Sequence, residues 1–176
     1  KLEDVKNQKN LLIFDVPLKF KSAFEIEDAQ VRDYIFKSLN LAHKMTIDKK
    51  IKGFINAPVD KKIFDNTCLG VTEYLSKKNM TKNKEVMMIY NKELAVVPLT
   101  THIEVKNVTN KINFNLIKTK LITLNKFYFK LFKKKPKIAI LGLNPHNSEN
   151  KTNSIENKVI RPAIKKLKKL KINIQG

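Results

Sequence analysis

Apolar residues recur along much of this chain at the spacing of an α-helix. After Ile26 they fall three and four residues apart and mark one face of a helix. The positions on that face are Val31, Tyr34, Ile35, Leu39 and Ala42. His43 falls just beside this face.

Two later stretches show the same helical spacing. The first predicts a long helix that Pro136 would end, because proline does not continue a helix. Its apolar positions are Ile117, Leu121, Leu124, Tyr128, Leu131 and Phe132. The second predicts a last helix with Ser154 as its N-cap and a kink at Pro162. Its apolar positions are Ile155, Val159, Ile160, Ala163, Ile164, Leu167 and Leu170.

Shorter apolar runs predict strands. Single strands are expected at residues 11–16, 51–56 and 138–143. Residues 84–90 and 94–100 predict a hairpin or two adjacent strands, with Pro98 favouring an edge position for the second.

Strand and helix patterns alternate along most of the chain. That order is typical of an α/β protein with a mostly parallel or mixed sheet. Residues 172–176 have the pattern of the start of another strand, and the chain does not begin with methionine. Both features suggest a fragment of a longer protein.

The composition is that of a folded domain. Of the 176 residues, 42% are hydrophobic and 30% are charged, which is enough apolar material for a packed core. A single cysteine, Cys68, excludes an internal disulfide and fits a reducing, cytoplasmic setting. No apolar run approaches the ~20 residues of a membrane span, so no membrane partner is expected.

The formal net charge of +20 has three readings. A basic face could bind nucleic acid. However, nearly all of the positive charge is lysine, and the arginines that read guanine in pairs of hydrogen bonds are scarce. The same charge would attract phosphorylated metabolites, or would lie on solvated helix faces.

Candidate chemistry lies at the ends of the predicted strands. The four glycines build no dinucleotide or phosphate-binding loop. Four polar clusters remain, at residues 56–61, 70–73, 100–102 and 144–146. Two of them carry histidine, His102 and His146, and imidazole is a common ligand of divalent ions. Two histidines at neighbouring strand ends could hold one metal, although a lone histidine is more often structural.

These clusters resemble one family. The stretches "INAPVDKK", "GVTEYLSKK", "EVMMIYNKELAVVPLTTHIEV", "IAILGLNPHNSE" and "VIRPAI" resemble the 4-hydroxythreonine-4-phosphate dehydrogenases of pyridoxal phosphate biosynthesis. The resemblance covers residues 53–176 and, more loosely, those before. It implies a three-layer α/β/α architecture within a two-domain fold like that of isocitrate and isopropylmalate dehydrogenases. It also implies a homodimer with its active site in a cleft.

The activity that the resemblance implies is a metal-dependent oxidation by NAD. The substrate would be 4-phosphohydroxy-L-threonine, a phosphorylated hydroxy-amino acid, and the product after decarboxylation would be 3-amino-2-oxopropyl phosphate. A divalent ion held by three histidines would polarise the reacting oxygen. Zinc, nickel, cobalt and iron suit imidazole ligands, and magnesium or manganese would need oxygen ligands as well.

The resemblance assigns roles to individual residues. His102 and His146 would be two of the three metal ligands. Thr72 and Lys61 would contact the substrate, and Asn144 and Glu149 would shape the loop that bears His146. Simpler readings stay open: Thr72 as a helix cap, Glu73 as a favourable charge at a helix start, and Lys61 as a surface lysine.

The sequence also departs from the family pattern. Val71 stands where the family has a substrate-binding histidine, Ala57 replaces a glycine, and residues 147–151 replace a glycine-rich loop. The third metal histidine has no counterpart, since the other histidine, His43, lies upstream. The expectation is therefore that residues 1–176 form the central segment of the fold, truncated at both ends, with most of the NAD site beyond it.

Three hypotheses follow from the residues. The first is a segment of an NAD- and metal-dependent dehydrogenase, acting on 4-phosphohydroxy-L-threonine or on another phosphorylated hydroxy acid. The second is a degenerate paralogue retained for binding, which the departure at Val71 favours. The third, a basic nucleic-acid-binding domain, rests on charge alone and is disfavoured. Under the first hypothesis this segment alone would bind metal weakly and turn over no substrate.

Overall fold

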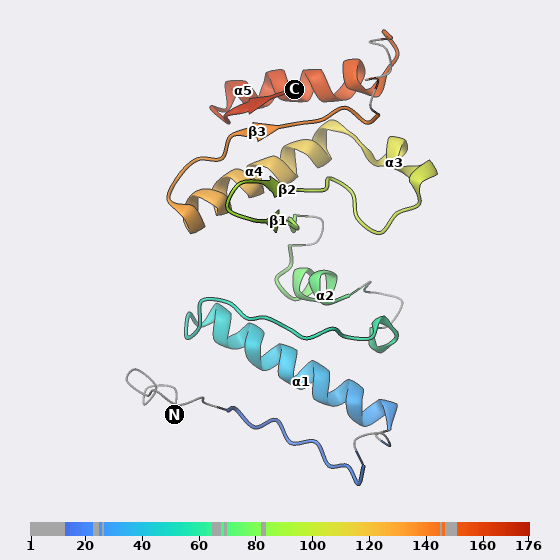
Figure 1. Ribbon diagram of the computed structural model, residues 1–176, viewed down its shortest axis with the longest axis vertical. Coiled ribbons are helices and arrows are strands. Elements are labelled where there is room, and N and C mark those ends of the chain that lie inside the picture. The colour runs from blue at the N-terminus through green and yellow to red at the C-terminus, as the bar shows by residue number, and fades with distance from the viewer. Residues whose placement is uncertain are drawn as a thin grey trace. The chain divides into compact units, whose positions relative to one another are not determined.

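The computed structural model describes residues 13–22, 25, 27–64, 68, 70–81, 84–144, 146 and 151–176 (Figure 1). The chain divides into two compact units, Lys1–Leu75 and Ser76–Gly176. Each unit has its own packing and is described by itself.

The first unit is built around one long helix, α1 (Asp28–Ile47). A short 3₁₀ turn, η2 (Lys61–Ile63), follows, and then α2 (Val71–Lys78), which begins in this unit. Phe36 of α1 packs edge-on against Phe64, with ring centroids 5.8 Å apart, and Tyr74 lies 5.0 Å from Phe36. The Tyr74 hydroxyl donates to Asn40 Oδ1 at 2.7 Å, so one polar contact fixes this aromatic cluster to α1.

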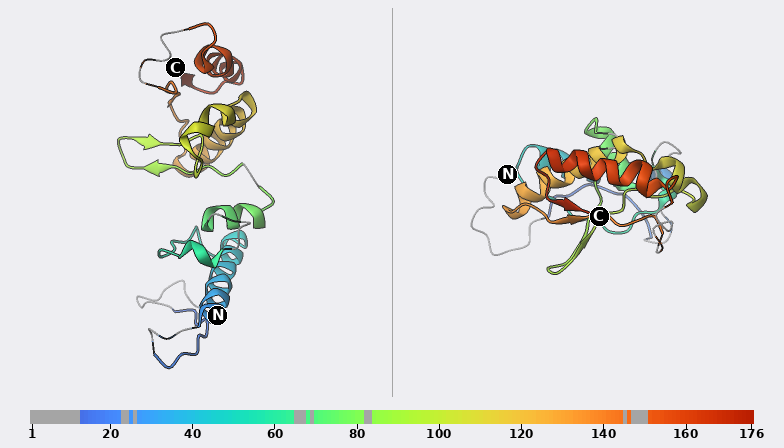
Figure 2. Two further views of the ribbon diagram at one scale, coloured as in Figure 1. Left: turned by 90° about the vertical axis from the view of Figure 1, so that its right-hand side faces the viewer. Right: turned by 90° about the horizontal axis from the view of Figure 1, so that it is seen from above.

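In its described residues, the second unit contains the end of α2, three further α-helices and four short strands. The helices are α3 (Val105–Lys111), α4 (Phe114–Phe132) and α5 (Arg161–Lys169). The strands β1 (Ile89–Tyr90) and β2 (Ala95–Val96) form an antiparallel hairpin. The strands β3 (Ile138–Ala139) and β4 (Ile174–Gln175) pair in parallel. Figure 2 shows the hairpin and the parallel pair as separate two-stranded sheets.

The core of the second unit lies between α4, α5 and the parallel strands. Ile117 of α4 and Leu167 of α5 are fully buried at its centre. The other buried members of this cluster are Ile112, Leu121, Ile160, Ala163, Ile164, Ile172 and Ile174. The members of the cluster in α4 and α5 pack together because their helical spacing places them on one face of each helix.

The parallel pair needs a crossover, and the last helix supplies it. Parallel strands cannot be joined by a tight turn, so the chain passes through α5 between β3 and β4. The pairing continues past the short strands, since the Ile140 amide donates to Gln175 O at 2.9 Å. Gly176 closes the ladder with φ +149°, where an added Cβ would collide with the Ile140 carbonyl oxygen. Only glycine fits that approach.

A π-helical turn, η4 (Glu156–Ile160), leads directly into α5. Pro162 explains it: proline has no N–H to donate, and its ring crowds the carbonyl four residues back. The wider turn relieves that crowding, and the Arg161 N–H bonds to Glu156 O, five residues back. A change of helix type thus precedes Pro162, whereas the kink expected there stays a prediction.

Several predicted elements are confirmed. The helix after Ile26 is α1, and the long helix is α4. The hairpin is present but shorter than predicted, and the last residues do form a strand, β4. Ser154 caps the start of the last helical segment, because its Oγ accepts from the Asn157 N–H at 3.2 Å.

Other predictions are wrong. Residues 13–16 and 51–56 form no strand, and residues 11 and 12 lie outside the described part of the chain. A strand needs a partner for its backbone groups, and a short apolar run does not supply one. The run at 138–143 keeps only two strand residues. Pro136 does not end α4, because the helix stops at Phe132 with Lys133 in the left-handed conformation. Helix α3 was not predicted.

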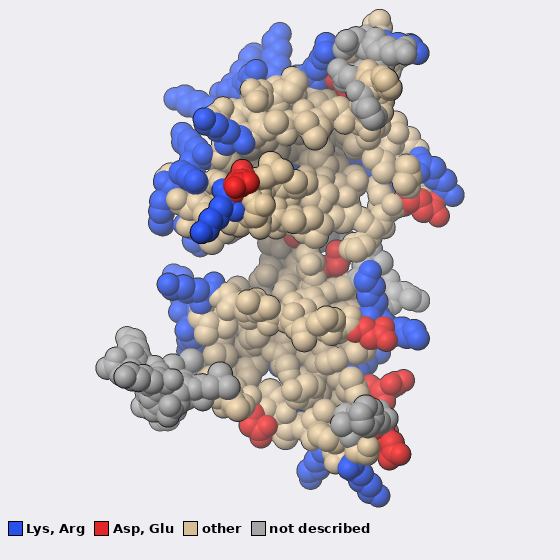
Figure 3. Space-filling model, in the orientation of Figure 1, with Lys and Arg blue, Asp and Glu red and all other residues tan. Residues whose placement is uncertain are grey.

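The basic surface of the structure agrees with the basic composition of the sequence. Lys and Arg side chains are spread around α4 and α5 on the face shown in Figure 3, with few acidic side chains among them.

Within the described residues, none of the helices combines the length and the apolar character that crossing a membrane requires.

The core predicts a clear difference between two leucines of the last helix. Leu167→Ala should lower the free energy of unfolding by about 2–5 kcal/mol, because Leu167 is fully buried and its loss leaves a cavity. Leu170→Ala is the matched control, since Leu170 is 55% exposed, and it should cost well under half as much. Urea unfolding followed by circular dichroism measures both. Equal losses would contradict the packing described.

Candidate functional site

His102 lies on the loop between β2 and α3, with its side chain exposed. Its φ is +54°, in the left-handed region that costs a non-glycine residue about 1–2 kcal/mol. Among the residues that the structure describes, the other non-glycine positions with positive φ are Lys49, Met80, Lys133 and Lys171, and each follows the end of a helix, where this conformation is a normal stop. His102 follows no helix, so its strained backbone has no such explanation.

His146 lies on the loop that follows β3, and it is also exposed. Its backbone N–H donates to Asn144 Oδ1 at 3.1 Å. This contact confirms that Asn144 shapes the loop. The other residue expected to shape it, Glu149, lies outside the described residues.

The two histidines belong to the same compact unit but to separate loops. Their imidazoles are of the kind that divalent metals select. A catalytic metal usually takes three protein ligands. Among the residues whose positions the structure gives, no group of three or more His, Cys, Asp or Glu side chains could hold a metal ion. The donor chemistry fits a metal, and the described donor set is incomplete.

A cleft of about 540 Å³ opens beside the His102 loop. Thr101 and Ile103, the two neighbours of His102, line it. Leu99 and Thr100, in the loop after β2, line it as well. The remaining wall residues are Lys84, Glu85, Lys111, Asn113, Asn115, Leu116, Thr119 and Lys120. Lys120 is paired with Glu85, so Lys84 and Lys111 supply the remaining positive charge of a space that suits an anionic ligand.

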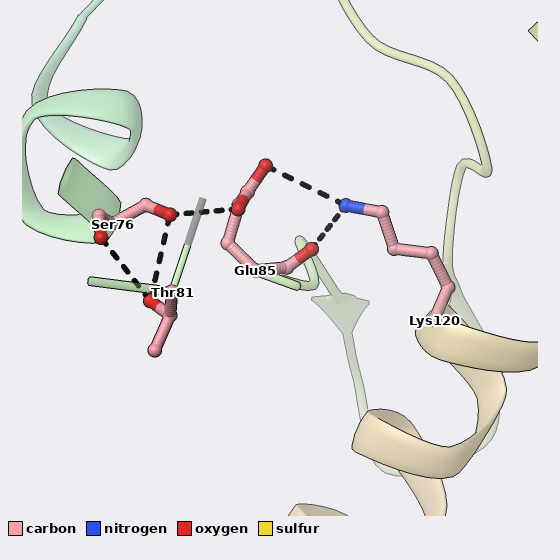
Figure 4. Close-up of polar contacts among 4 residues, drawn as sticks. All are labelled: Ser76, Thr81, Glu85 and Lys120. Carbon is pink, nitrogen blue, oxygen red and sulfur yellow. Dashed lines mark hydrogen bonds and ion pairs between the residues drawn. The ribbon is translucent and has the colours of Figure 1, made fainter. Parts of the chain in front are cut away.

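A polar network fixes one wall of this cleft (Figure 4). Lys120 donates to the backbone carbonyl of Glu85 and lies 3.7 Å from its carboxylate Oε1. The Ser76 hydroxyl donates to Glu85 Oε2 at 2.7 Å. Thr81 completes the network through the Ser76 carbonyl oxygen, at 3.3 Å. The side chains of Lys120 and Glu85 are only 12% and 27% exposed, so this contact is screened less than a surface pair.

The two predicted substrate contacts lie in the first unit. Thr72 is exposed in the first turn of α2. It is not the cap, because the first helical bond runs from the Tyr74 N–H to the Gly70 carbonyl oxygen. Lys61 is exposed at the start of η2. Val71, which departs from the family pattern, is the first residue of α2 and is half-buried.

Sequence reasoning missed one residue that contacts the strand end before His146. Glu156 is only 2% exposed, and its Oε1 accepts from the Leu143 N–H at 3.0 Å. A signal was present in the sequence. Glu156 precedes Ile160, Ala163, Ile164 and Leu167 at the spacings that mark the buried face of the last helix. An acidic residue at an apolar position is seldom incidental.

The arrangement of elements matches that of a known class of enzyme structures. The solved structure of 4-hydroxythreonine-4-phosphate dehydrogenase from Klebsiella pneumoniae superimposes with a TM-score of 0.71 at 22% sequence identity. The match covers 84% of this chain and 46% of that one. The mixed α/β fold is therefore that of this class of dehydrogenases.

Sequence comparison names the family. Residues 2–176 match the family described as pyridoxal phosphate biosynthetic protein PdxA, and the chain belongs to it. A 4-hydroxythreonine-4-phosphate dehydrogenase from Wigglesworthia glossinidia brevipalpis is 35% identical over 81% of this chain and 44% of its own length. A D-threonate 4-phosphate dehydrogenase from Pectobacterium atrosepticum is 26% identical over 93% of this chain and 52% of its own. The chain thus spans about half the length of these relatives.

The strained backbone of His102 gives a test that separates a structural role from a binding role. His102→Gly should leave stability within about 1 kcal/mol of the parent, since relief of the left-handed strain offsets the added freedom of the unfolded chain. The same variant should weaken zinc binding, measured by calorimetric titration. Met80→Gly is the matched control, because Met80 has the same φ of +54° in the described chain. A large loss of stability with unchanged zinc affinity would show that the imidazole is structural.

The polar network predicts unequal roles for two lysines of α4. Lys120→Met should destabilise the second unit by about 1–3 kcal/mol, because it removes the ammonium that donates to the partly buried backbone carbonyl of Glu85 and pairs with its carboxylate. Lys118→Met should be nearly neutral, since Lys118 is exposed. Thermal unfolding of the two variants makes the comparison. Similar melting temperatures would contradict the network.

Proposed function

We propose that this chain is part of an NAD- and divalent-metal-dependent dehydrogenase that oxidises 4-phosphohydroxy-L-threonine, with decarboxylation to 3-amino-2-oxopropyl phosphate, in pyridoxal phosphate biosynthesis. The observation that carries the proposal is family membership across residues 2–176. The structure supports it in one respect, since both motif histidines lie on exposed loops of one compact unit.

In this proposal each candidate residue has a role. His102 and His146 supply two of the imidazole ligands of the divalent ion. When bound, the ion acts as a Lewis acid toward the substrate's hydroxyl oxygen. Thr72 and Lys61 contact the substrate. A third ligand and the NAD-binding residues come from outside the described chain. The protein acts in the cytoplasm as a homodimer within the three-layer, two-domain fold that the family resemblance implies.

The strained loop at His102 supports the metal role. Backbone strain persists when the surroundings impose it, and it concentrates at functional sites. An exposed histidine that gains nothing from this conformation would relax to an ordinary one. The neighbouring cleft, with Lys84 and Lys111 on its wall besides the paired Lys120, adds a field that attracts phosphorylated substrates.

A second candidate substrate deserves testing because of Val71. The residue replaces a histidine that the family resemblance assigns to substrate binding, and valine cannot donate a hydrogen bond. The relative from Pectobacterium atrosepticum is named for another phosphorylated hydroxy acid, D-threonate 4-phosphate. That compound lacks the amino group of 4-phosphohydroxy-L-threonine. A site that has lost an imidazole could therefore favour it.

The activity is tested on the protein purified from its source. With NAD, a divalent metal salt and 4-phosphohydroxy-L-threonine, absorbance at the wavelength of NADH should rise. His102→Gly and His146→Ala should reduce the rate to background, because each removes a metal ligand. His43→Gln is the control for general loss of histidine, and it should keep the rate within a few-fold.

The same assay decides between the substrates. A higher kcat/KM for D-threonate 4-phosphate would support the second candidate. Absence of NADH formation with both compounds would contradict a dehydrogenase and would favour the degenerate paralogue.

A further inference from the structure

The segment that ends in His146 is fixed at successive points by hydrogen bonds of different kinds. The Ile138 and Ile140 amides donate to Asn173 O at 3.0 Å and to Gln175 O at 2.9 Å, which holds the strand to β4. The Leu143 amide donates to the Glu156 carboxylate at 3.0 Å. Beyond Leu143 the His146 amide is bonded locally, to Asn144 Oδ1. Glu156 is thus the contact between the last sheet bond and the histidine.

Several hydrogen bonds hold the backbone around Glu156. It is the first residue of the π-helical turn η4, and its carbonyl accepts the Arg161 N–H. The preceding loop is closed by two bonds of Asn157. Its N–H donates to Ser154 Oγ at 3.2 Å, and its Nδ2 donates to Lys151 O at 2.9 Å. Both contacts restrict where the carboxylate of the adjacent residue can lie.

Burial makes this carboxylate costly to retain. Glu156 is 2% exposed on a helix face whose other buried residues, such as Ile160 and Ala163, are apolar. Taking a carboxylate out of water costs several kcal/mol, and an apolar residue at such a position is often neutral or stabilising by comparison. The core alone would therefore favour an apolar side chain here. The carboxylate supplies a hydrogen-bond acceptor to the strand end, where the Leu143 amide lies 3.0 Å from Oε1.

We infer that Glu156 is a positioning residue for His146. Its carboxylate fixes the Leu143 amide and thereby sets where the Asn144–His146 turn leaves the sheet. It acts through the backbone and not on the reacting atoms. The inference rests on the proposed function for its metal-binding consequence, while the anchoring of Leu143 is independent of it. Groups that orient a metal ligand typically change metal affinity 10–100-fold when removed.

The anchoring is tested without metal. Glu156→Met keeps the length of the side chain and removes the acceptor, and Glu156→Gln keeps one carbonyl oxygen. Amide hydrogen exchange should be faster at Leu143 in Glu156→Met, unchanged at Ile140, and intermediate at Leu143 in Glu156→Gln. Glu93→Gln, at the exposed hairpin turn, is the control and should change neither amide.

The functional consequence is tested by titration with zinc alone. Glu156→Met should bind zinc about 10–100-fold more weakly than the parent chain. Its melting temperature should be unchanged or higher, because an apolar side chain replaces a buried polar group on an apolar helix face. Glu156→Gln should recover part of the affinity. A role confined to stability would not produce lower affinity together with an undiminished melting temperature.

Each outcome bears on a different claim. Unchanged exchange at Leu143 in Glu156→Met would overturn the anchoring. Unfolding of Glu156→Met would show that the core itself needs the carboxylate, and it would overturn the positioning role. If the parent chain binds no zinc through His146 while Leu143 still loses protection, the metal role in the proposed function fails and the anchoring stands.

Discussion

The packing of α5 against α4 and the parallel strand pair is the constraint on which the second unit depends. Ile117 and Leu167 are completely buried there, and the two strands are too short to hold together by their own hydrogen bonds. The parallel arrangement exists because the crossover through α5 buries an apolar face on them. The strand end at Leu143, which precedes His146, leaves this core directly, so its position is fixed by the same packing.

The two histidine loops are held in different ways. His146 follows a strand end that is bonded to β4, to Glu156 and to Asn144 in turn. His102 follows the hairpin and keeps a left-handed backbone next to a cleft. Polar contacts thus account for the first loop, whereas local strain marks the second. Each exposed histidine thus has its own constraint, hydrogen bonds for His146 and a left-handed backbone for His102. The two constraints support a shared role in binding.

The sequence predicted helices better than strands, for a physical reason. The faces of α1 and α4 repeat over about five turns, and that of the last helical segment, from η4 through α5, over about four. That periodicity reports burial directly. The run at 51–56 has no such repeat, and whether it pairs depends on a partner elsewhere in the chain. Helix α3 was missed because its seven residues, rich in β-branched and asparagine side chains, are weak helix formers. Its ends are set by Glu104 and by Ile112, which is buried in the core.

The candidate site was predictable as motifs but not as contacts. His102 and His146 stood out as histidines in polar clusters, while Glu156 was read only as part of an amphipathic helix. Its role is seen only in the structure, where Glu156 Oε1 in the π-helical turn accepts from the Leu143 N–H at the strand end at 3.0 Å. Pro162 contributes to that meeting from six residues away, since it forces the wide turn that begins at Glu156. The proline and the buried acid, which look like two local irregularities in the sequence, are therefore parts of one arrangement that holds the histidine loop.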